Sequence, residues 1–375
     1  MTVMSSDTAL EEFIDGLLHQ GIDRRASDIH IEPTLSADYV IRMRIDGVLR
    51  EGAPCPSALA TRLVICLKIM AQLDIAERRR PQDGQFIFGP PETRCSFRVS
   101  TLPTLRGEKI VLRLLRGQRE GLSLAWLGMP DAMKRIFLRL LRRPQGLVLL
   151  TGPTGSGKTM TLYAALNAMR RDQLNICSVE DPVEIPLAGV TQCQVNLKAQ
   201  LDFATLLRAL LRQDPDVIMV GEIRDRTTAA IAVHAAQTGH LVLSTVHALS
   251  AAEVPLRLAQ FGVHAALIKS VLLMVMAQRL VRRLCEQCRY ETTEAHALAT
   301  RFAADLVPRR RWCAPGCEHC DSGYTGRCGV FHMLSPMTAS GTQVQADGLW
   351  RAGLALVEQG TTSWEELIRV LGEPA

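Results

Sequence analysis

A glycine-rich segment near the middle of the chain contains the residue types that bind phosphate groups. Residues 152–159 read GPTGSGKT, which fits the pattern GxxxxGK[ST]. In this pattern backbone N–H groups surround the β-phosphate, Lys158 neutralises the β- and γ-phosphates, and the Thr159 hydroxyl binds Mg²⁺. The segment therefore predicts a site for ATP with Mg²⁺. Its binding residues are expected to be Gly152, Pro153, Thr154, Gly155, Ser156, Gly157, Lys158, Thr159 and the adjoining Met160.

The segments on either side of these glycines are those that a phosphate-binding loop needs. Residues 147–151 have the short apolar pattern of a buried strand, and residues 162–169 have a helical pattern. A helix that begins at the loop places the partial positive charge of its N-terminus beside the phosphates. A chance glycine-rich turn would lack both neighbours, so we expect a phosphate loop between a strand and a helix.

An acidic residue, Glu222, ends a second apolar segment at residues 215–222. In open parallel sheets, ligands bind beyond the carboxyl ends of the strands, so this carboxylate is expected near the phosphate loop. Its expected role is to orient and polarise the water that attacks the γ-phosphate, directly or through the ligands of the metal. The alternative is a core strand with an exposed acidic end. We expect a hydrolase rather than a passive nucleotide-binding protein.

Four cysteines form two CxxC pairs that are separated by 28 residues. Four thiolates suit tetrahedral Zn²⁺ in a closed structural site, whereas free thiols or a redox pair would explain the two pairs less economically. The expected zinc ligands are Cys285, Cys288, Cys317 and Cys320. A helical segment within residues 291–311 is expected to bridge the long spacing. Cys313 and Cys328 are rival candidates as ligands.

The overall composition is that of a folded globular chain of two or three domains. The 375 residues are 47% hydrophobic and 22% charged, and only 5% are aromatic. Lys and Arg number 43 against 38 Asp and Glu, and the net charge of +5 is too small to require a nucleic-acid or membrane partner. The 11 cysteines fit reduced thiols plus a metal site better than a disulfide framework. We therefore expect a cytoplasmic protein.

The sequence contains no pattern typical of a signal peptide or a membrane span. Residues 1–12 lack a basic region followed by an apolar core. The most apolar long stretch, residues 263–281, is interrupted by Lys269, Gln278 and Arg279. Their cost within hydrocarbon argues against a span, so we expect this stretch to form a helix of a soluble domain.

The chain divides into five segments by its patterns. Strand-like runs are found at residues 39–45, 85–88, 95–99 and 109–114. They predict a small α+β domain with a hairpin turn at Asp46 and Gly47. Short apolar strands that alternate with helices then predict a parallel-sheet α/β domain. The expected boundaries are 1–116 for the α+β domain, 117–124 for a linker, 125–284 for the P-loop domain, 285–328 for the zinc module and 329–375 for a helical C-terminal region.

Several further segments carry a family resemblance. They are residues 179–184, 214–225 and 238–247 of the α/β domain and residues 26–32, 42–47 and 98–104 of the N-terminal domain. The first three resemble the Asp box, the Walker B segment and the His box of the secretion ATPases that drive type II secretion and type IV pilus assembly (GspE/PilB type). The resemblance covers roughly residues 26–330. It implies a RecA-like P-loop ATPase domain preceded by a PAS-like domain, with a shortened N-terminus that puts the usual docking to the membrane in question.

The resemblance also implies roles for charged residues outside the phosphate loop. Arg98 and Arg113 correspond to arginines that reach from the N-terminal domain to the nucleotide, where a guanidinium stabilises the charge that develops on the γ-phosphate. Without the resemblance, both would be interpreted as solvated charges on strands. Glu180 corresponds to an acid of the Asp box that assists the attacking water or Mg²⁺.

Two residue pairs on regular elements are further candidates at the nucleotide site. Arg208 and Arg212 are four residues apart and share one helix face. The family uses such arginines at the nucleotide site or the subunit boundary, and a solvated helix face is the alternative. His240 and His247 resemble the His-box pair that links the nucleotide state to the neighbouring domain, and a core histidine is the alternative. The sequence leaves open a contact between His240 and Glu180.

By this resemblance the chain is expected to be a Mg²⁺-dependent ATPase that works as a homo-hexameric motor for a type II secretion pseudopilus or a type IV pilus. Its expected partner is a polytopic inner-membrane platform protein, through which it would associate peripherally with the membrane. No direct nucleic-acid contact is expected. The tetracysteine site favours assembly over retraction. The alternatives are a pilus retraction motor, a RecA-like nucleic-acid translocase and a nucleotide-dependent scaffold without turnover.

Overall fold

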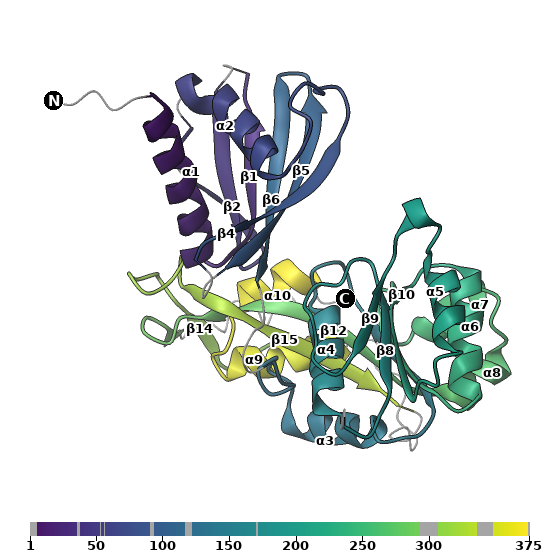
Figure 1. Cartoon of the computed structure of the whole chain (residues 1–375). Helices are drawn as coiled ribbons and strands as arrows, with labels where there is room; N and C mark the ends of the chain where they lie inside the picture. Colours follow the sequence, from purple (N-terminus) through teal and green to yellow (C-terminus); the bar gives the residue numbers. More distant parts are fainter. Residues whose placement is uncertain are drawn as a thin grey trace. The chain divides into compact units, whose positions relative to one another are not determined.

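The computed structural model describes residues 6–35, 38–52, 54–55, 57–90, 94–116, 122–169, 172–292, 307–335 and 348–373. The chain forms two compact units, Met1–Arg119 and Glu120–Ala375 (Figure 1). Most of the expected linker, residues 117–121, lies outside the described residues. None of the described helices is long and apolar enough to cross a membrane.

The N-terminal unit is a six-stranded antiparallel sheet with two helices packed against it. Its strands lie in the order β3-β2-β1-β6-β5-β4. Their bounds are β1 Ala26–Pro33, β2 Tyr39–Ile45, β3 Val48–Glu51, β4 Gln82–Phe88, β5 Cys95–Thr104 and β6 Gly107–Arg116. Helices α1 (Ser6–Asp23) and α2 (Ser57–Met70) share one apolar core with the sheet, which includes Leu18, Met43 and Phe97. This unit has the α+β architecture that the strand patterns predict.

The first hairpin of this unit forms where the sequence predicts it. Asp46 and Gly47 connect β2 to β3 with φ angles of 48° and 85°, which are the left-handed values that two-residue hairpin turns require. Glycine adopts such a value without steric cost, and Asp tolerates it. The four expected strands all lie within β2, β4, β5 and β6.

The C-terminal unit is an α/β fold around a seven-stranded sheet in the order β15-β12-β7-β11-β10-β8-β9. Neighbouring strands are parallel except β15, which is antiparallel to β12. The strand bounds are β7 Gly146–Thr151, β8 Ile176–Glu180, β9 Thr191–Gln194, β10 Val217–Ile223, β11 Leu241–Val246, β12 Leu272–Leu284 and β15 Tyr324–Leu334. Successive residues of β7, such as Leu149 and Leu150, belong to different apolar clusters. The sheet is therefore buried on both faces.

Helices supply the other half of each cluster. Helices α3 (Asp131–Leu140) and α4 (Lys158–Ala168) belong to one cluster, and the helices between β9 and β12 belong mainly to the other, as their grouping in Figure 1 shows. The latter are α5 Phe203–Leu210, α6 Arg226–Gln237, α7 Val254–Gln260 and α8 Ala265–Val271, and the short 3₁₀ turn η1 Leu197–Ala199 precedes them. The phosphate loop connects β7 to α4, which begins before the expected residue 162.

The prediction of a helix at residues 263–281 was wrong over most of its length. Helix α8 ends at Val271, and the chain continues directly as β12. This strand lies between β7 and β15 and is buried on both faces over much of its length. A strand buried on both faces is continuously apolar, so its pattern cannot be distinguished from that of a buried helix.

The segments after β12 differ in part from the expected helices. The ends of the expected bridging helix are strands, because β13 (Tyr290–Thr292) pairs antiparallel with β14 (Arg311–Cys313). Residues 293–306 lie outside the described residues. The expected helical C-terminal region begins as the end of β15 and then forms α9 (Gly348–Glu358) and α10 (Trp364–Leu371).

Candidate functional site

Glycines at both ends shape the phosphate loop. Gly152 follows β7 with φ of 147°, and Gly157 precedes α4 with φ of 85°. A Cβ atom on Gly152 would lie 2.5 Å from the backbone oxygen of Gln278, and one on Gly157 would lie 2.9 Å from its side-chain nitrogen. Both positions therefore require glycine for conformation and for space. The loop rests directly on β12.

The Lys158 amino group points back into the loop. Its Nζ donates to the carbonyl oxygens of Gly152 and Pro153 at 2.8 and 2.9 Å. Burial lowers the pKa of Lys158, while the Glu222 carboxylate opposes this shift and the Arg279 guanidinium adds to it. These three charged groups therefore act on one another electrostatically beside the loop.

The other two predicted residues at the start of α4 differ in their surroundings. Thr159 is the second residue of the helix and is partly exposed. Met160 packs against the apolar core. The hydroxyl of Thr159 is therefore the oxygen ligand that this turn can offer to a metal ion, and the Met160 side chain contributes packing.

Glu222 lies at the carboxyl edge of the sheet, next to the loop. It is the next-to-last residue of β10 rather than the residue after the strand, and the β10–β11 register shifts between Val220 and Ile223. Such an irregularity changes the direction of the side chains around it. One carboxylate oxygen of Glu222 lies 3.3 Å from Nε2 of His247, and the other pairs with the Arg224 guanidinium. This carboxylate is thus held from two sides.

The two histidines of the predicted pair lie at opposite edges of the sheet. His247 follows β11 and reaches Glu222, whereas His240 precedes β11. The His240 ring contacts the backbone oxygen of Ala235 at 3.0 Å. Because β8, β10 and β11 run parallel, Glu180 at the carboxyl end of β8 cannot be reached from His240. The contact that the sequence left open does not form.

Glu180 is enclosed in a buried hydrogen-bond network behind the phosphate loop. Its side chain is only 2% exposed. The hydroxyl of Ser178 donates to one carboxylate oxygen at 2.6 Å, and Gln192 Nε2 donates to the same oxygen at 2.9 Å. The Tyr163 hydroxyl, on α4, donates to the other oxygen. Glu180 therefore joins the helix after the loop to the Asp box, and its oxygens are engaged by protein donors.

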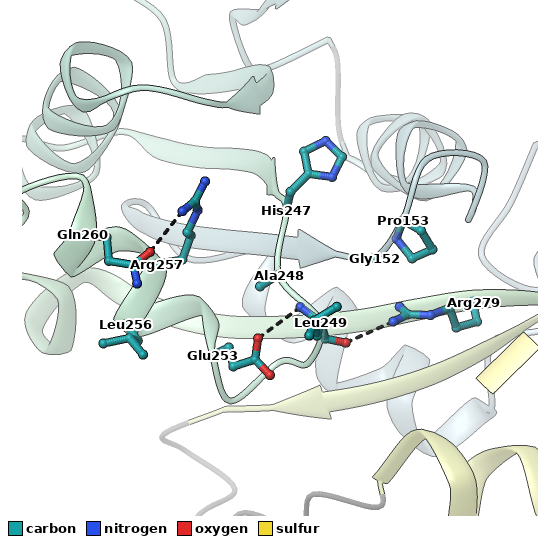
Figure 2. A pocket seen from close by; sticks show the side chains of 10 residues that line it. All are labelled: Gly152, Pro153, His247, Ala248, Leu249, Glu253, Leu256, Arg257, Gln260 and Arg279. Carbon is teal, nitrogen blue, oxygen red and sulfur yellow. Dashed lines mark hydrogen bonds between the residues drawn. The ribbon is translucent and has the colours of Figure 1, made fainter. Parts of the chain in front are cut away.

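A cavity of about 410 Å³ opens beside the first residues of the loop (Figure 2). It is lined by Gly152, Pro153, His247, Ala248, Leu249, Glu253, Leu256, Arg257, Gln260 and Arg279. Two backbone oxygens fix the Arg279 guanidinium at the cavity. Its Nη1 donates to the backbone oxygen of Gln278 and its Nη2 to that of Leu249, both at 3.0 Å. Arg257 donates to the Gln260 side chain at 3.0 Å. Two cationic side chains therefore border the space next to the loop.

The sequence analysis missed Arg224 and Arg279 as members of this site. Arg224 lies within the segment that resembles Walker B, two residues after Glu222, so its position was a usable signal. Arg279 was interpreted as a polar interruption of a helix. Arg279 lies beside the loop because β12 is a strand that pairs with β7, the strand before the loop.

The four other predicted arginines make contacts within their own units. In the N-terminal unit, Arg113 Nε donates to Asp28 at 2.9 Å and Arg98 lies 4.0 Å from Asp83. Arg208 is on the exposed side of α5, and Arg212 donates back to the carbonyl oxygen of Arg208 at 2.9 Å. Both side chains are exposed, but α5 ends at Leu210, so Arg212 lies in the turn after the helix and not on the predicted helix face.

The four cysteines of the two CxxC pairs converge, with all Sγ atoms within 4.8 Å of one another. Three of the Sγ–Sγ separations are 3.7 Å for Cys285–Cys317, 3.9 Å for Cys288–Cys320 and 3.7 Å for Cys317–Cys320. A tetrahedron with Zn–S bonds of about 2.3 Å has edges of about 3.8 Å. The ligand set therefore fits Zn²⁺ in type, number and spacing.

The two rival cysteines are not part of this cluster. Cys313 lies in β14 and Cys328 in β15, and within the described part of the chain neither joins the group of four. Burial raises the pKa of Cys328 to about 11, so its thiol stays protonated and packs among apolar side chains.

The chain is similar to known secretion proteins over nearly its whole length. A family model described as "Type II/IV secretion system protein" matches residues 4–369. The chain is 48% identical to "Protein transport protein HofB homolog" of Escherichia coli K12, covering 97% of this chain and 82% of that protein. It is 42% identical to "Type IV pilus assembly ATPase PilB" of Pseudomonas aeruginosa, covering 98% and 68% of the two chains. It is 45% identical to "Type II secretion system protein E" of Aeromonas hydrophila, covering 98% and 76%.

Two solved structures share the fold. The ATPase DotB of Legionella pneumophila superposes with a TM-score of 0.64 at 20% identity, covering 95% of this chain and 94% of that one. The pilus retraction motor PilT with bound ADP superposes with a TM-score of 0.61 at 24% identity, covering 96% and 97%. At these identities the likeness concerns the α/β ATPase fold.

Proposed function

Because the chain belongs to the type II/IV secretion system protein family and is an ATPase of that family, we propose that it hydrolyses ATP with Mg²⁺ to drive assembly of a type II secretion pseudopilus or a type IV pilus. One observation carries the proposal. The phosphate loop with Lys158, the acid Glu222 and its partner His247 all lie at the carboxyl edge of one parallel sheet.

In this proposal the residues of the edge divide the work. The loop N–H groups and Lys158 bind the β- and γ-phosphates. Thr159 and Glu222 offer hydroxyl and carboxylate oxygens, which are the ligands that Mg²⁺ prefers. When bound, the metal ion supplies charge neutralisation at the phosphates. Glu222 orients the attacking water, and His247 with Arg224 fixes the carboxylate for that purpose.

The remaining predicted residues take supporting places in the proposal. Arg98 and Arg113 donate to the γ-phosphate from the N-terminal unit, which we propose is PAS-like. Exposure of both guanidinium groups supports their availability, since 47% and 61% of the two side chains are exposed. Arg208, on α5, and Arg212, in the turn after this helix, are proposed for a subunit boundary because both are exposed. His240 has no place here, since it lies at the opposite edge of the sheet.

The position of Glu180 suggests a role that differs from direct contact with water. Three protein donors already engage its carboxylate. We therefore propose that Glu180 assists hydrolysis by fixing α4 and the Asp box relative to each other.

The family also supports a proposal for the assembly. A homo-hexamer would work at the cytoplasmic side of the inner membrane through a polytopic platform protein, without direct contact to nucleic acid. The tetracysteine site, which fits Zn²⁺, supports assembly over retraction. A retraction motor is the competing proposal. The two are separated by whether deletion of the gene abolishes filaments or leaves cells with more of them.

Phosphate release from MgATP by the purified chain tests the hydrolysis. Lys158→Ala and Glu222→Gln are each expected to lower turnover by about 10² or more, because each removes charge stabilisation or water activation. Glu365→Gln makes the same chemical change as Glu222→Gln on α10, at an exposed ion pair with Arg311, and should keep wild-type turnover. Equal rates in wild type and Glu222→Gln would refute the proposal.

A further inference from the structure

Gln278 is a fully buried amide directly beneath the phosphate loop. Its side chain is 0% exposed. Its Oε1 accepts a hydrogen bond of 2.8 Å from the hydroxyl of Thr161, on the first turn of α4. Within the described part of the chain, its Nε2 has no hydrogen-bond partner. One of the two polar atoms of this buried side chain is therefore without a hydrogen-bond partner.

The unused atom faces the loop. The nitrogen would lie 2.9 Å from a Cβ on Gly157, the residue before Lys158. The backbone oxygen of Gln278 would lie 2.5 Å from a Cβ on Gly152. The two glycines that bound the loop thus both rest on one residue of β12.

A second buried polar group, on the loop itself, also has no hydrogen-bond partner among the described residues. This group is the hydroxyl of Ser156. It would lie 2.8 Å from a Cβ on Gly152, next to the backbone of Gln278. Unpaired polar groups in a protein interior lower its stability. An apolar side chain of the same length as Gln278 would fill this place without that cost, so the amide indicates a partner that the loop supplies.

We propose that Gln278 is a positioning residue for nucleotide binding. Its second amide atom forms a hydrogen bond with the loop when the loop surrounds the phosphates, and this bond fixes the distance between Gly152 and Gly157. The inference rests on the proposed ATPase site and adds to it a residue that acts from β12 without touching the nucleotide. The neighbouring Arg279 also anchors this strand, because its guanidinium donates to the backbone oxygen of Leu249.

Gln278→Met is the first test, because Met has the same length and no polar group. We expect the affinity for MgADP, measured by calorimetry, to fall about tenfold. The melting temperature without nucleotide should stay close to that of the wild type. The variant loses the bond from Thr161, whose hydroxyl can still donate to the Gly157 oxygen, but it also loses the unpaired buried nitrogen. In turnover with MgATP, KM should rise about tenfold and kcat should change by less than about threefold, the signature of lost binding rather than lost chemistry.

Gln278→Glu is the second variant and decides the question if Gln278→Met does not fold. A carboxylate keeps the shape and still accepts from Thr161, but it cannot donate to the loop and places negative charge beside the phosphates. MgADP affinity should therefore fall about tenfold or more. Gln237→Met, at the exposed end of α6, is the matched control and should bind MgADP as the wild type does.

The outcomes separate this inference from the proposed function. If the wild type binds no MgADP, or if Lys158→Ala binds it equally well, the nucleotide site itself is wrong. If the wild type binds, Lys158→Ala does not, and both Gln278 variants bind with wild-type affinity, only the positioning role is wrong. A lower melting temperature with unchanged affinity would make Gln278 a packing residue and would overturn the inference.

Discussion

Two buried carboxylates, Glu180 and Glu366, show how individual residues hold the elements of the C-terminal unit in place. Glu180 is held by three neutral donors next to the phosphate loop, whereas Glu366 is held by two arginines. Hydrogen bonds to charged groups contribute more than those between neutral groups. Removal of one donor from either carboxylate should therefore have a measurable effect on stability.

The Tyr163 hydroxyl offers a direct test at Glu180. Burial raises the pKa of Tyr163, and the hydrogen bond to the Glu180 carboxylate adds to this shift, so the phenol remains a donor. Tyr163→Phe should lower the free energy of unfolding by about 1.5–3 kcal/mol, the usual value for a bond to a charged group. Tyr324→Phe, which breaks a bond of 2.8 Å to the Ser363 hydroxyl, should cost only about 1 kcal/mol. Equal losses for the two variants in urea denaturation would contradict a stronger hydrogen bond at Glu180.

Glu366 makes stability depend on acid pH. Burial alone would raise the pKa of Glu366, but hydrogen bonds from Arg369 and Arg282 outweigh it and lower the pKa below its ordinary value. A carboxyl group with a lowered pKa stabilises the folded chain above its unfolded pKa of about 4.3, and this contribution is lost as pH falls through the lowered value. The salt bridge should therefore weaken below about pH 4.

Glu366→Gln is expected to lower the free energy of unfolding at pH 7 by about 3–5 kcal/mol, because it leaves the buried Arg282 guanidinium without its charged partner. The difference from wild type should shrink as pH falls from about 5 to 3. Urea denaturation across this range measures it. Glu291→Gln, at an exposed pair with Arg310, is the control and should leave the free energy of unfolding unchanged both at pH 7 and at pH 3. If the difference between Glu366→Gln and wild type did not change with pH, this would be evidence against the lowered pKa of Glu366.

At the scale of elements, β12 is the strand that connects the nucleotide site, α10 and the cysteine cluster of the C-terminal unit. It carries Gln278 and Arg279 under the phosphate loop, then Arg282 in the ion pair with α10, and it leads directly to Cys285. The nucleotide site and the cysteine cluster are therefore attached to one strand. The Arg282 ion pair lies between them and fixes the strand independently of the cluster.

We propose that the tetracysteine site, which fits Zn²⁺, holds that ion. Its removal should loosen the region around the four cysteines without abolishing nucleotide binding. With a chelator, hydrogen exchange should accelerate at residues 307–323 and around Cys285, since the closed site stabilises this region. The affinity for MgADP should change by less than about threefold, because Arg282 still anchors β12. If MgADP affinity were lost together with the zinc ion, β12 would couple metal binding at the four cysteines to the phosphate loop.

The sequence predicts those parts of the site that are local in the chain. The phosphate loop, Glu222 and the cysteine pairs each have a pattern of a few residues with its own chemistry, and each lies where that pattern implies. The contacts of His247 with Glu222 and of Gln278 with Thr161 join residues that are 25 and 117 positions apart. No local pattern specifies such pairs. The strand β12 was misread for the same reason, because only its neighbours in the sheet make it a strand.

At the scale of the whole molecule, the two units have separate interiors. One apolar cluster belongs entirely to the N-terminal unit, and the other four belong to the C-terminal unit. Units with their own cores can unfold in separate steps. The phosphate loop, with its proposed nucleotide contacts, belongs to the C-terminal unit.

Calorimetry should therefore record two unfolding transitions. Nucleotide that binds only the folded state stabilises it by about 2.7 kcal/mol at a concentration one hundred times Kd. MgADP should raise the transition of the C-terminal unit and leave the other in place, and Lys158→Ala should abolish the rise. If both transitions moved together with MgADP, Arg98 and Arg113 would be the first residues to test for bridging the units.

The antiparallel strand β15 has a consequence for the synthesis of the chain. Among the residues that the structure describes it is the last strand, and it pairs with the side of β12 opposite β7. The 13 residues of β12 are largely buried. Until the ribosome has passed both cysteine pairs, β12 presents an unpaired apolar edge of the kind that other chains can join. A chain that stops before residue 324 should therefore aggregate, as size-exclusion chromatography would show, even though its phosphate loop is complete.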